Sequence, residues 1–382
     1  MVRLVSLILI AISLLSCKES EQDRIARFVS EWSGKIIGIV VLLGLTNLFF
    51  YSCRSESLEN IRVENVICQP ICGDDYIIGG ARDMKLSNSI LTVTDTKSDS
   101  MLLFFDMKAG KYLRKAGTRG HGPSEFTMIS SLLGACSKNS FSFYDPNKRT
   151  YYQTNEITQD EEIRFTPVFR VDSIFPLEIQ PMANGQFMAT GIYDDCLFCL
   201  LDSAGRVQRK SGELFYRDED EKQVSGIVRS QAYMFDVASS PSKTKFVAFL
   251  LSADILAFYQ LENDSLCLIK ENILSYPEYE YRNNSQHYSG TPKSVPLNYL
   301  CAACTEDYVY LLYSGKTFNE HNLGVFKGNL IYVYNWNGDK VAMIRSDKML
   351  KRICLSEDGK TMYAIAYNPD PILVQFSLPQ WQ

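Results

Sequence analysis

The sequence has little histidine and lacks the common catalytic motifs. It contains three histidines in 382 residues, and neither H-E-x-x-H nor G-x-S-x-G occurs. The sialidase Asp-box (S-x-D-x-G-x-T-W) is also missing. Carboxylates are numerous, but a glycosidase needs two of them opposed across a site, a relation that spacing alone does not show. These absences favour a protein that is not an enzyme.

Two further features are missing, a basic surface pattern and a helical pattern. The net charge is −5, and no basic patch with interleaved aromatics occurs, which argues against nucleic acid as a partner. No long stretch with a 3.6-residue apolar period follows residue 60. The chain instead has 22 Tyr, 21 Phe and 46% hydrophobic residues, a composition that suits strands packed face to face around a large core.

What is present is a recurring strand–turn–strand unit. It is clearest at residues 102–114 (LLFFDMKAGKYLR), 197–209 (LFCLLDSAGRVQR) and 330–344 (LIYVYNWNGDKVAMI). Each unit has an apolar run, then Asp or Asn, then Gly three or four residues on. The Asp or Asn side chain can cap its own turn and Gly tolerates positive φ, so each unit predicts a β-hairpin.

The spacing of these units predicts the architecture. Asp106 and Asp202 are 96 residues apart, and Asp202 and Asn335 are 133 apart, which fits two and three repeats of about 45–48 residues. Fainter units fill the expected intermediate and final positions, at residues 141–152 (FSFYDPNKRTYY), 256–269 (LAFYQLENDSLCLI) and 360–378. Six hairpins of this spacing predict an all-β fold, a six-bladed β-propeller over residues 58–382.

Closure of such a ring could use the first strand of the domain. We expect residues 61–67 to complete the last blade, with residues 372–378 as their neighbour.

The N-terminus carries two export signals in tandem. Residues 1–16 contain Arg3 and an apolar run that ends before Cys17, which is typical of a secretory signal with a lipoprotein cleavage box. Lys35 then precedes a second apolar run, residues 36–51, that leads to Cys53. Sixteen residues are short for a membrane span of about 20 but suit a signal segment or a tight, untilted helix.

These signals leave two alternatives for the mature protein. Either Cys17 is lipidated and residues 36–51 form a second membrane segment, or Cys53 is lipidated and residues 1–34 are an upstream extension. We favour Cys53, because the folded domain then begins after a short tether, although the box at Cys17 has the better residue at its −3 position. Residues 35–53 are thus a second signal-like or membrane segment. Either alternative predicts a membrane-anchored protein of the cell envelope, as an outer membrane lipoprotein.

Four segments resemble a known family. They are residues 117–126 (GTRGHGPSEF), 308–316 (YVYLLYSGK), 330–341 and 362–378. Together they resemble the TolB-like six-bladed propeller lipoproteins of Gram-negative bacteria, over roughly residues 58–380. One departure is His121, where the family more often has Gln or another polar residue. The resemblance implies an exported, lipid-anchored propeller, and it implies no particular chemistry.

The first of these segments, residues 117–126, is a candidate ligand-binding loop. Its amides could hold an anion, with His121 and Glu125 as acid and base. It matches neither the dinucleotide pattern nor the P-loop, since no Lys-Ser/Thr follows its last Gly. The alternative, which we favour, is an inter-blade crossover in which glycines allow turns, Pro123 stiffens the exit and Phe126 enters the core.

A second candidate is the insertion at residues 276–296, which has four tyrosines and several amides. Exposed tyrosines of this kind bind sugars or peptides, so we predict Tyr279, Tyr281 and His287 as ligand-binding residues. The alternative, a surface loop whose tyrosines pack on neighbouring blades, is the commoner case.

The 11 cysteines raise the question of a metal site. Cys196-x-x-Cys199 lies in a predicted strand, where an offset of three residues places side chains on opposite faces. Cys301-x-x-Cys304 precedes a strand, where a turn would allow a zinc site. We nevertheless predict no metal and no cofactor, because free cysteines acting as small core residues are commoner. In an exported protein some of them could also pair.

Two functions therefore remain. The first is a non-catalytic binding module that holds a peptide, a glycan or a partner protein on one propeller face. The second is a propeller hydrolase or lyase that uses carboxylates of the central channel. Fold alone does not choose between them, because propellers host both. Charged residues converging around a metal would favour the enzyme, and an aliphatic channel would favour binding.

Overall fold

The structure of the protein is a computed structural model. It describes residues 61–73, 75–122, 124–134, 139–282, 287–367 and 369–381. The predictions for Cys17, Cys53 and the segment at residues 36–51 lie outside these ranges. Within them, no helix combines the length and the apolar character needed to cross a membrane.

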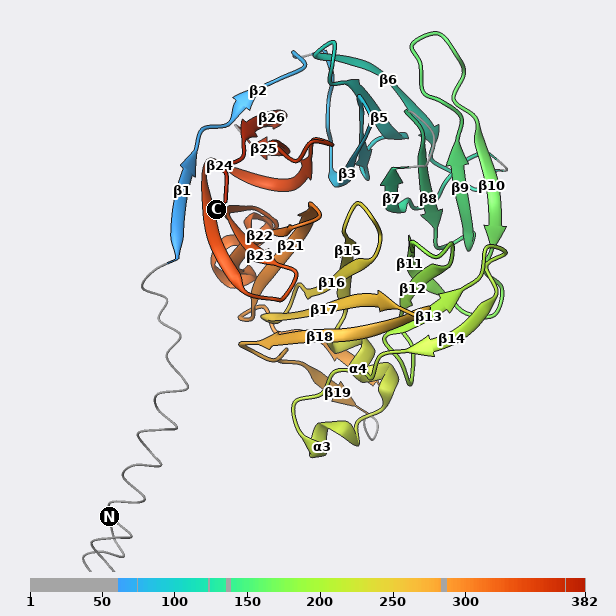
Figure 1. Ribbon diagram of the computed structural model, residues 1–382, viewed down its shortest axis with the longest axis vertical. Helices are drawn as coiled ribbons and strands as arrows, with labels where there is room; N and C mark the ends of the chain where they lie inside the picture. The colour runs from blue at the N-terminus through green and yellow to red at the C-terminus, as the bar shows by residue number, and fades with distance from the viewer. Residues whose placement is uncertain are drawn as a thin grey trace, which may run out of the picture. The chain divides into compact units, whose positions relative to one another are not determined.

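The chain folds as an all-β propeller, whose sheets follow one another around a ring in chain order (Figure 1). The inner strands β3, β7, β11 and β15 lie towards the centre, and β6, β10, β14 and β18 towards the rim. Four sheets have four antiparallel strands each: β3 (Ala81–Ser87), β4 (Ile90–Asp95), β5 (Ser100–Asp106) and β6 (Lys111–Thr118); β7 (Ser130–Gly134), β8 (Phe141–Asp145), β9 (Thr150–Thr154) and β10 (Phe165–Arg170); β11 (Pro176–Pro181), β12 (Phe187–Gly191), β13 (Phe198–Leu201) and β14 (Val207–Ser211); β15 (Phe235–Ser239), β16 (Lys245–Leu250), β17 (Ile255–Glu262) and β18 (Ser265–Ile273).

The C-terminal third forms one sheet of eight strands. Its long strand β24 (Lys340–Leu355) pairs with β23 through residues 340–345 and Leu350, and with β25 through residues 349–355. The remaining strands of this sheet are β21 (Pro296–Cys304), β22 (Tyr308–Thr317), β23 (Gly328–Asn335), β25 (Thr361–Tyr367), β26 (Pro371–Ser377), β1 (Arg62–Val66) and β2 (Gln69–Pro70).

The N-terminal strands close the ring in a way that differs from the prediction. β1 pairs in parallel with β24, from Arg62 opposite Ala342 to Val66 opposite Ser346. Of the two N-terminal strands, only β2 pairs with β26. The chain changes partner at Cys68, which is buried and whose backbone N–H donates to the Asp347 carboxylate at 2.8 Å. The expected pairing of residues 61–67 with 372–378 is therefore wrong, and β2 takes that place.

All six predicted hairpins are present, as β5–β6, β8–β9, β13–β14, β17–β18, β23–β24 and β25–β26. They do not hold equivalent positions, however. The pair β8–β9 joins the second and third strands of its sheet, whereas β5–β6 joins the third and fourth. The sequence repeat thus marks turns of the same chemistry, at more than one position within a blade.

The turns have the predicted caps. Asp106 Oδ1 accepts the backbone N–H groups of Lys108 and Ala109, both at 2.9 Å. Asp202 Oδ1 does the same for the residues at 204 and 206, again at 2.9 Å. Gly110, which lies in the turn that Asp106 caps, has φ +65°, a conformation that glycine adopts without strain. These side chains are fully explained by turn geometry.

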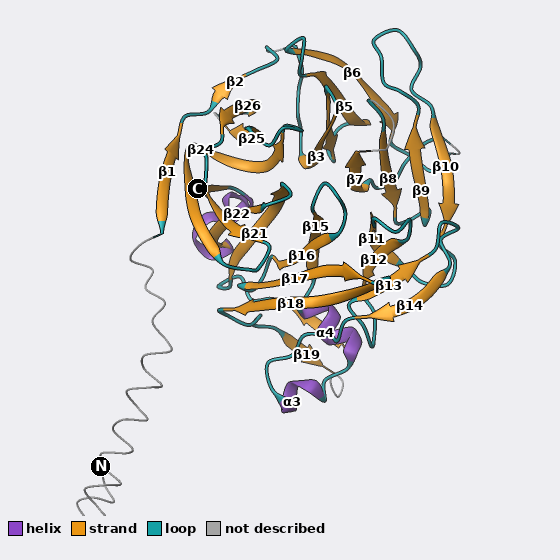
Figure 2. Ribbon diagram, in the orientation of Figure 1, coloured by secondary structure: helices purple, strands orange, loops and turns teal. Residues whose placement is uncertain are grey.

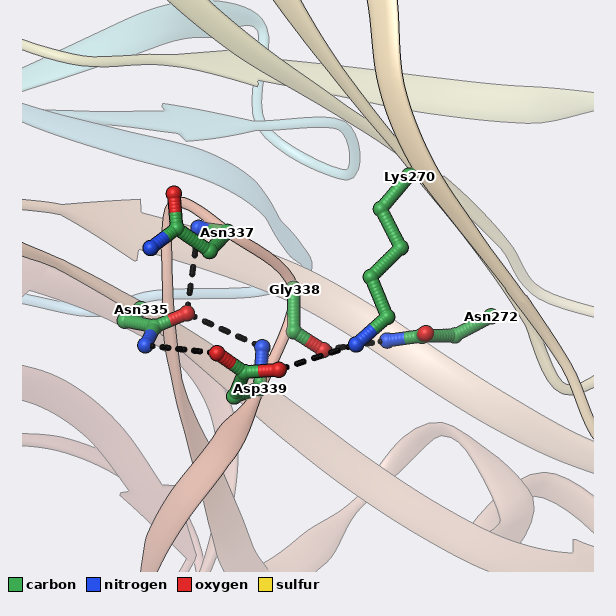
Figure 3. A network of polar contacts seen from close by, with 6 residues as sticks. All are labelled: Lys270, Asn272, Asn335, Asn337, Gly338 and Asp339. Carbon is green, nitrogen blue, oxygen red and sulfur yellow. Dashed lines mark hydrogen bonds and ion pairs between the residues drawn. The ribbon is translucent and has the colours of Figure 1, made fainter. Parts of the chain in front are cut away.

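The cap of the β23–β24 turn also joins two sheets (Figure 3). Asn335 accepts from Asn337 and Asp339, at 3.0 and 2.9 Å, and Asp339 pairs with Lys270 of β18 at 2.9 Å. Asn272 of the same strand donates to the carbonyl of residue 338 at 2.6 Å. The rim of the fourth sheet is thereby hydrogen-bonded to the β23–β24 turn of the eight-stranded sheet.

Short helices and a small ribbon are added outside the blades (Figure 2). α3 (Glu219–Lys222) and α4 (Gly226–Ala232) lie between β14 and β15, and the ribbon β19 (Glu280–Arg282) and β20 (His287–Gly290) lies between β18 and β21. α5 (Phe318–His321) and a 3₁₀ helix (Asn322–Phe326) follow β22. Tyr276, Tyr279 and Tyr288 pack against the hydrophobic cluster that includes α4, so the two insertions support each other.

Candidate functional site

A cavity of about 320 Å³ lies where α4 meets the inner strands. Its wall is largely apolar, and four charged residues line it: Arg82 of β3, Glu178 of β11 and Asp236 of β15, which come from three different sheets, and Arg229 of α4. The apolar wall includes Leu177, Leu197, Leu214, Phe215, Met234 and Phe235. An apolar hollow with a few converging polar groups is the usual form of a ligand site.

Irregular pairing of the inner strands accompanies these charged residues. The register of β3 against β4 shifts between Ala81 and Asp83, and that of β11 against β12 shifts between Pro176 and Glu178. A bulge adds a residue and re-aims the side chains around it. Two innermost strands thus carry the same irregularity next to the cavity.

Helix α4 is fixed against the loop that follows β12. Ser230 donates its hydroxyl hydrogen to the carbonyl of Tyr193. Gly226 begins the helix so close to this loop that a Cβ atom there would lie 1.6 Å from the carbonyl oxygen of Asp194. Arg229 lines the cavity, but it donates to the carbonyls of Val224 at 3.2 Å and Leu214 at 3.4 Å. Its guanidinium group therefore holds the cavity wall together.

The carboxylates of this region are energetically costly when ionised. Burial raises the pKa of Glu178 well above its ordinary value, and the neighbouring Asp236 and Asp83 raise it further. Burial also raises the pKa of Asp236 and of Asp83, against the opposing effect of Arg352. Asp236 is exposed, but it lies on the inner strand β15, where protein atoms replace part of the surrounding water and so raise its pKa.

Two arginines oppose the raised pKa values of the cavity carboxylates without forming ion pairs: Arg82 and Arg352 both lower the pKa of Glu178 and of Asp236. Among the residues that the structure describes, none of the three carboxylates forms an ion pair within 4.0 Å. Asp83 accepts backbone N–H groups from Met84 at 2.8 Å and Leu132 at 3.3 Å. Glu178 and Asp236 therefore line the cavity as carboxyl groups without an ion-pair partner, and a cation that entered the cavity would favour their ionised form.

The loop at residues 117–126 has the structure of a crossover. Phe126 is fully buried, and Glu125 accepts the backbone N–H of Gly122 at 2.8 Å. Lys148 donates to the carbonyls of both Gly122 and Glu125 at 2.6 Å. His121 is exposed in this loop. The structure does not place the predicted pair of His121 and Glu125 among the residues that line the cavity.

The tyrosines of the second candidate loop lie behind the cavity wall. Tyr279 is half-buried, with its ring centroid 6.4 Å from that of Tyr233, a cavity-lining residue. Tyr281 is exposed, and its ring centroid lies 6.0 Å from that of Tyr279. His287 begins β20. The ligand-binding roles of these three residues remain predictions.

The two C-x-x-C pairs differ from their predicted geometries. Cys196 precedes β13, and its sulfur lies 3.9 Å from that of Cys199, so the expected placement on opposite faces is wrong. The prediction placed Cys196 inside the strand, whereas β13 begins at Phe198. Cys301 and Cys304 both lie within β21, and they pack into hydrophobic clusters on opposite faces of the sheet. Across the described part of the chain, no group of three or more His, Cys, Asp or Glu side chains could hold a metal.

Comparison with protein families identifies the chain. The model of the TolB-like 6-blade propeller-like family matches residues 63–358. The chain belongs to this family. The family resemblance seen in the sequence is thereby confirmed. A comparison of sequences with curated proteins finds no match.

Solved structures share the fold of this TolB-like chain. A member of the DUF4221 family from Bacteroides vulgatus aligns with a TM-score of 0.53 at 12% identity, covering 83% of this chain and 97% of the other. A Bacteroides fragilis protein proposed to be exported aligns with a TM-score of 0.50 at 12% identity, covering 84% of this chain and 100% of the other. At this identity the likeness shows the propeller fold alone.

Sequence reasoning missed the charged residues of the TolB-like cavity. Glu178 and Asp236 belong to neither a hairpin turn nor a predicted loop. The available signal was a single acidic residue inside each otherwise apolar first strand of a blade, in PLEIQP and FDVAS.

Proposed function

We propose that this TolB-like protein is an exported, non-catalytic binding module of the cell envelope and that its ligand enters the cavity beside α4. One observation carries the proposal: Glu178 and Asp236 line a largely apolar cavity without forming an ion pair, although Arg82 and Arg229 line it too. An unpaired carboxylate in such a place costs free energy that a bound cation recovers.

The ligand class follows from the chemistry of the wall. A cationic head on an aliphatic stem satisfies the carboxylates and the apolar residues together. The volume of about 320 Å³ is near the lower end of the range for small-molecule sites, about 300–1,000 Å³. A basic side chain of a peptide or partner protein has this size and character, so we assign a peptide segment as the ligand.

The proposal extends to blade count and anchoring. The eight-stranded sheet would supply two blades, one from β21, β22, β23 and the first half of β24, the other from the second half of β24 with β25, β26 and β2. That makes six blades. A lipid on Cys53, or alternatively Cys17, would tether the propeller to a membrane. The exported label of one solved relative supports this location.

Binding of capped tripeptides tests the proposal. A peptide with arginine between two leucines should bind, and its analogue with glutamate in the centre should not, as measured by isothermal titration calorimetry. Glu178→Gln and Asp236→Asn should each weaken binding at least tenfold, because each removes a carboxylate that would pair with the arginine of the peptide. Glu156→Gln changes an exposed carboxylate in the loop after β9 and serves as the matched control. Equal binding of both peptides would exclude the cation site.

One observation favours a second function, that of a hydrolase or lyase. Glu178 has a raised pKa beside a second carboxylate, an arrangement that general acid catalysis uses. Release of products from peptide or glycan libraries would establish this function, provided that Glu178→Gln abolishes the release. Binding without turnover would support the binding module.

A further inference from the structure

Two buried thiols meet at the wall of the cavity. Cys196 and Cys199 are 3% and 0% exposed, and their sulfur atoms lie 3.9 Å apart. Cys196 also lines the cavity, which gives a disulfide reagent its route of approach to the pair. Neither thiol has a role in the proposed binding of a cation.

We propose that Cys196 and Cys199 form a redox-active dithiol that closes to a disulfide by exchange with a low-molecular-weight disulfide. The bond length of a disulfide is about 2.05 Å, so the sulfurs need to approach each other by about 1.9 Å. Cys199 is held in β13, paired with Ala189 and Lys210 of the adjacent strands. Cys196 lies in the irregular segment between β12 and β13, and it supplies the movement.

The surroundings of the pair favour a thiolate. The two sulfurs share a hydrogen bond in which either can be the donor. With Cys196 as donor, this bond lowers the pKa of Cys199, against the opposing effect of burial, and raises the pKa of Cys196. The ammonium group of Lys210 favours the same ionisation, and the ion pair of Lys210 with Asp195 at 2.7 Å keeps that group beside the sulfurs. A stabilised thiolate is what distinguishes a reactive cysteine from a structural one.

The exchange is balanced with glutathione disulfide as the oxidant. Cys196 passes its proton to Cys199 through their hydrogen bond, attacks the incoming disulfide as a thiolate, forms a mixed disulfide on its own sulfur and releases one glutathione thiol. Cys199 then attacks the Cys196 sulfur and releases the second glutathione. Two S–H bonds of the protein break and one S–S bond forms. The two electrons and both protons leave with the two glutathione thiols.

Cys301 and Cys304 provide an internal control with the same spacing. Their side chains lie on opposite faces of β21, so they cannot reach each other without breaking the strand. Burial raises the pKa of Cys301 to about 11 and that of Cys304 to about 12, which keeps both thiols protonated at neutral pH.

Trypsin separates the two pairs onto different peptides, which makes the experiment direct. Residues 171–206 contain Cys196 and Cys199 as their only cysteines, and residues 294–316 contain Cys301 and Cys304. The full chain is equilibrated with glutathione at a series of oxidised-to-reduced ratios, denatured with N-ethylmaleimide and digested. The mass of each peptide then reports whether it carries two alkyl groups or an internal disulfide.

We expect the 171–206 peptide to lose two hydrogens and both alkylation sites as the glutathione ratio becomes oxidising, with the 294–316 peptide doubly alkylated throughout. Cys199→Ser should trap the mixed disulfide, seen as one glutathione adduct on Cys196. Double alkylation of both peptides at every ratio would overturn the proposal, and so would an equal response of both. Peptide binding is not measured here, so failure of the proposed ligand site leaves this test intact.

Discussion

Replacement of Phe126 by alanine should destabilise the propeller strongly, because this residue joins two blades from within a loop. Its ring is fully buried and lies 4.9–5.1 Å, centroid to centroid, from the rings of Phe143, Tyr152 and Phe165, which surround it at near-perpendicular angles. Truncation of a buried phenylalanine costs about 3–5 kcal/mol, through lost transfer free energy and the cavity left behind. We expect about 4 kcal/mol, since three edge contacts are lost together.

Thermal and urea unfolding of the variant measure this cost. The unfolding entropy is about 2.1 cal/mol/K per residue, so for the domain at residues 61–382 each kcal/mol shifts Tm by about 1.5 °C. Phe126→Ala should therefore lower Tm by about 6 °C. Phe126→Leu keeps most of the volume and should cost only about 1–2 kcal/mol.

His121→Ala is the control in the same loop. Its side chain is exposed, so the change in unfolding free energy should stay within about 0.5 kcal/mol. A cost below about 1 kcal/mol for Phe126→Ala would refute the crossover interpretation of residues 117–126. A large effect of His121→Ala on binding of the arginine tripeptide would restore this loop as a ligand site.

Four further changes have defined outcomes. Asp202→Ala removes the acceptor of two backbone N–H groups in an exposed turn and should cost about 1–2 kcal/mol in urea unfolding; a neutral result would contradict the capping role. Because the pKa of Glu178 is raised in the folded state, its contribution to stability is complete below the unfolded-state pKa and is lost as pH rises through the folded-state pKa. The unfolding free energy of Glu178→Gln should therefore increase relative to that of the parent protein as pH rises. An increase towards low pH would contradict the raised pKa. Gly226→Ala should lower Tm and weaken peptide binding together, because a Cβ atom clashes with the loop after β12; an unchanged Tm would show that α4 is not seated there. Deletion of residues 61–70 should lower Tm by removing β1 and β2, and an unchanged Tm would mean that neither strand closes the ring.

The hairpins were predictable from sequence because their chemistry is local. Asp106, Asp202 and Asn335 accept hydrogen bonds from residues two to four positions further on, so the cap and its acceptor are read from one short window. The β17–β18 turn is different. Asn263 and Asp264 there both adopt positive φ, at 46° and 62°, and the turn is made by backbone conformation in place of a cap.

Strand closure was harder to predict, because partner choice is not local. The first strand has an apolar pattern that suits either β24 or β26. The change of partner comes at Cys68, whose backbone N–H donates to the carboxylate of Asp347, a residue 279 positions away. A two-residue strand such as β2 leaves almost no periodic signal of its own.

The cavity could not be predicted from the sequence either, because its residues come from several blades and their proximity is not local. Asp83, Glu178 and Asp236 come from three blades and meet only because the ring brings the first strand of each blade to its centre. Each is the single acid of its own strand, which local rules interpret as a solvent-facing position. In a propeller the inner edge of a first strand faces other blades, so an acid there is held near other acids at a free-energy cost. The repeat that reveals this fold therefore also indicates where to look for its chemistry: at charged residues in the first strand of each blade, which the turn motifs do not explain.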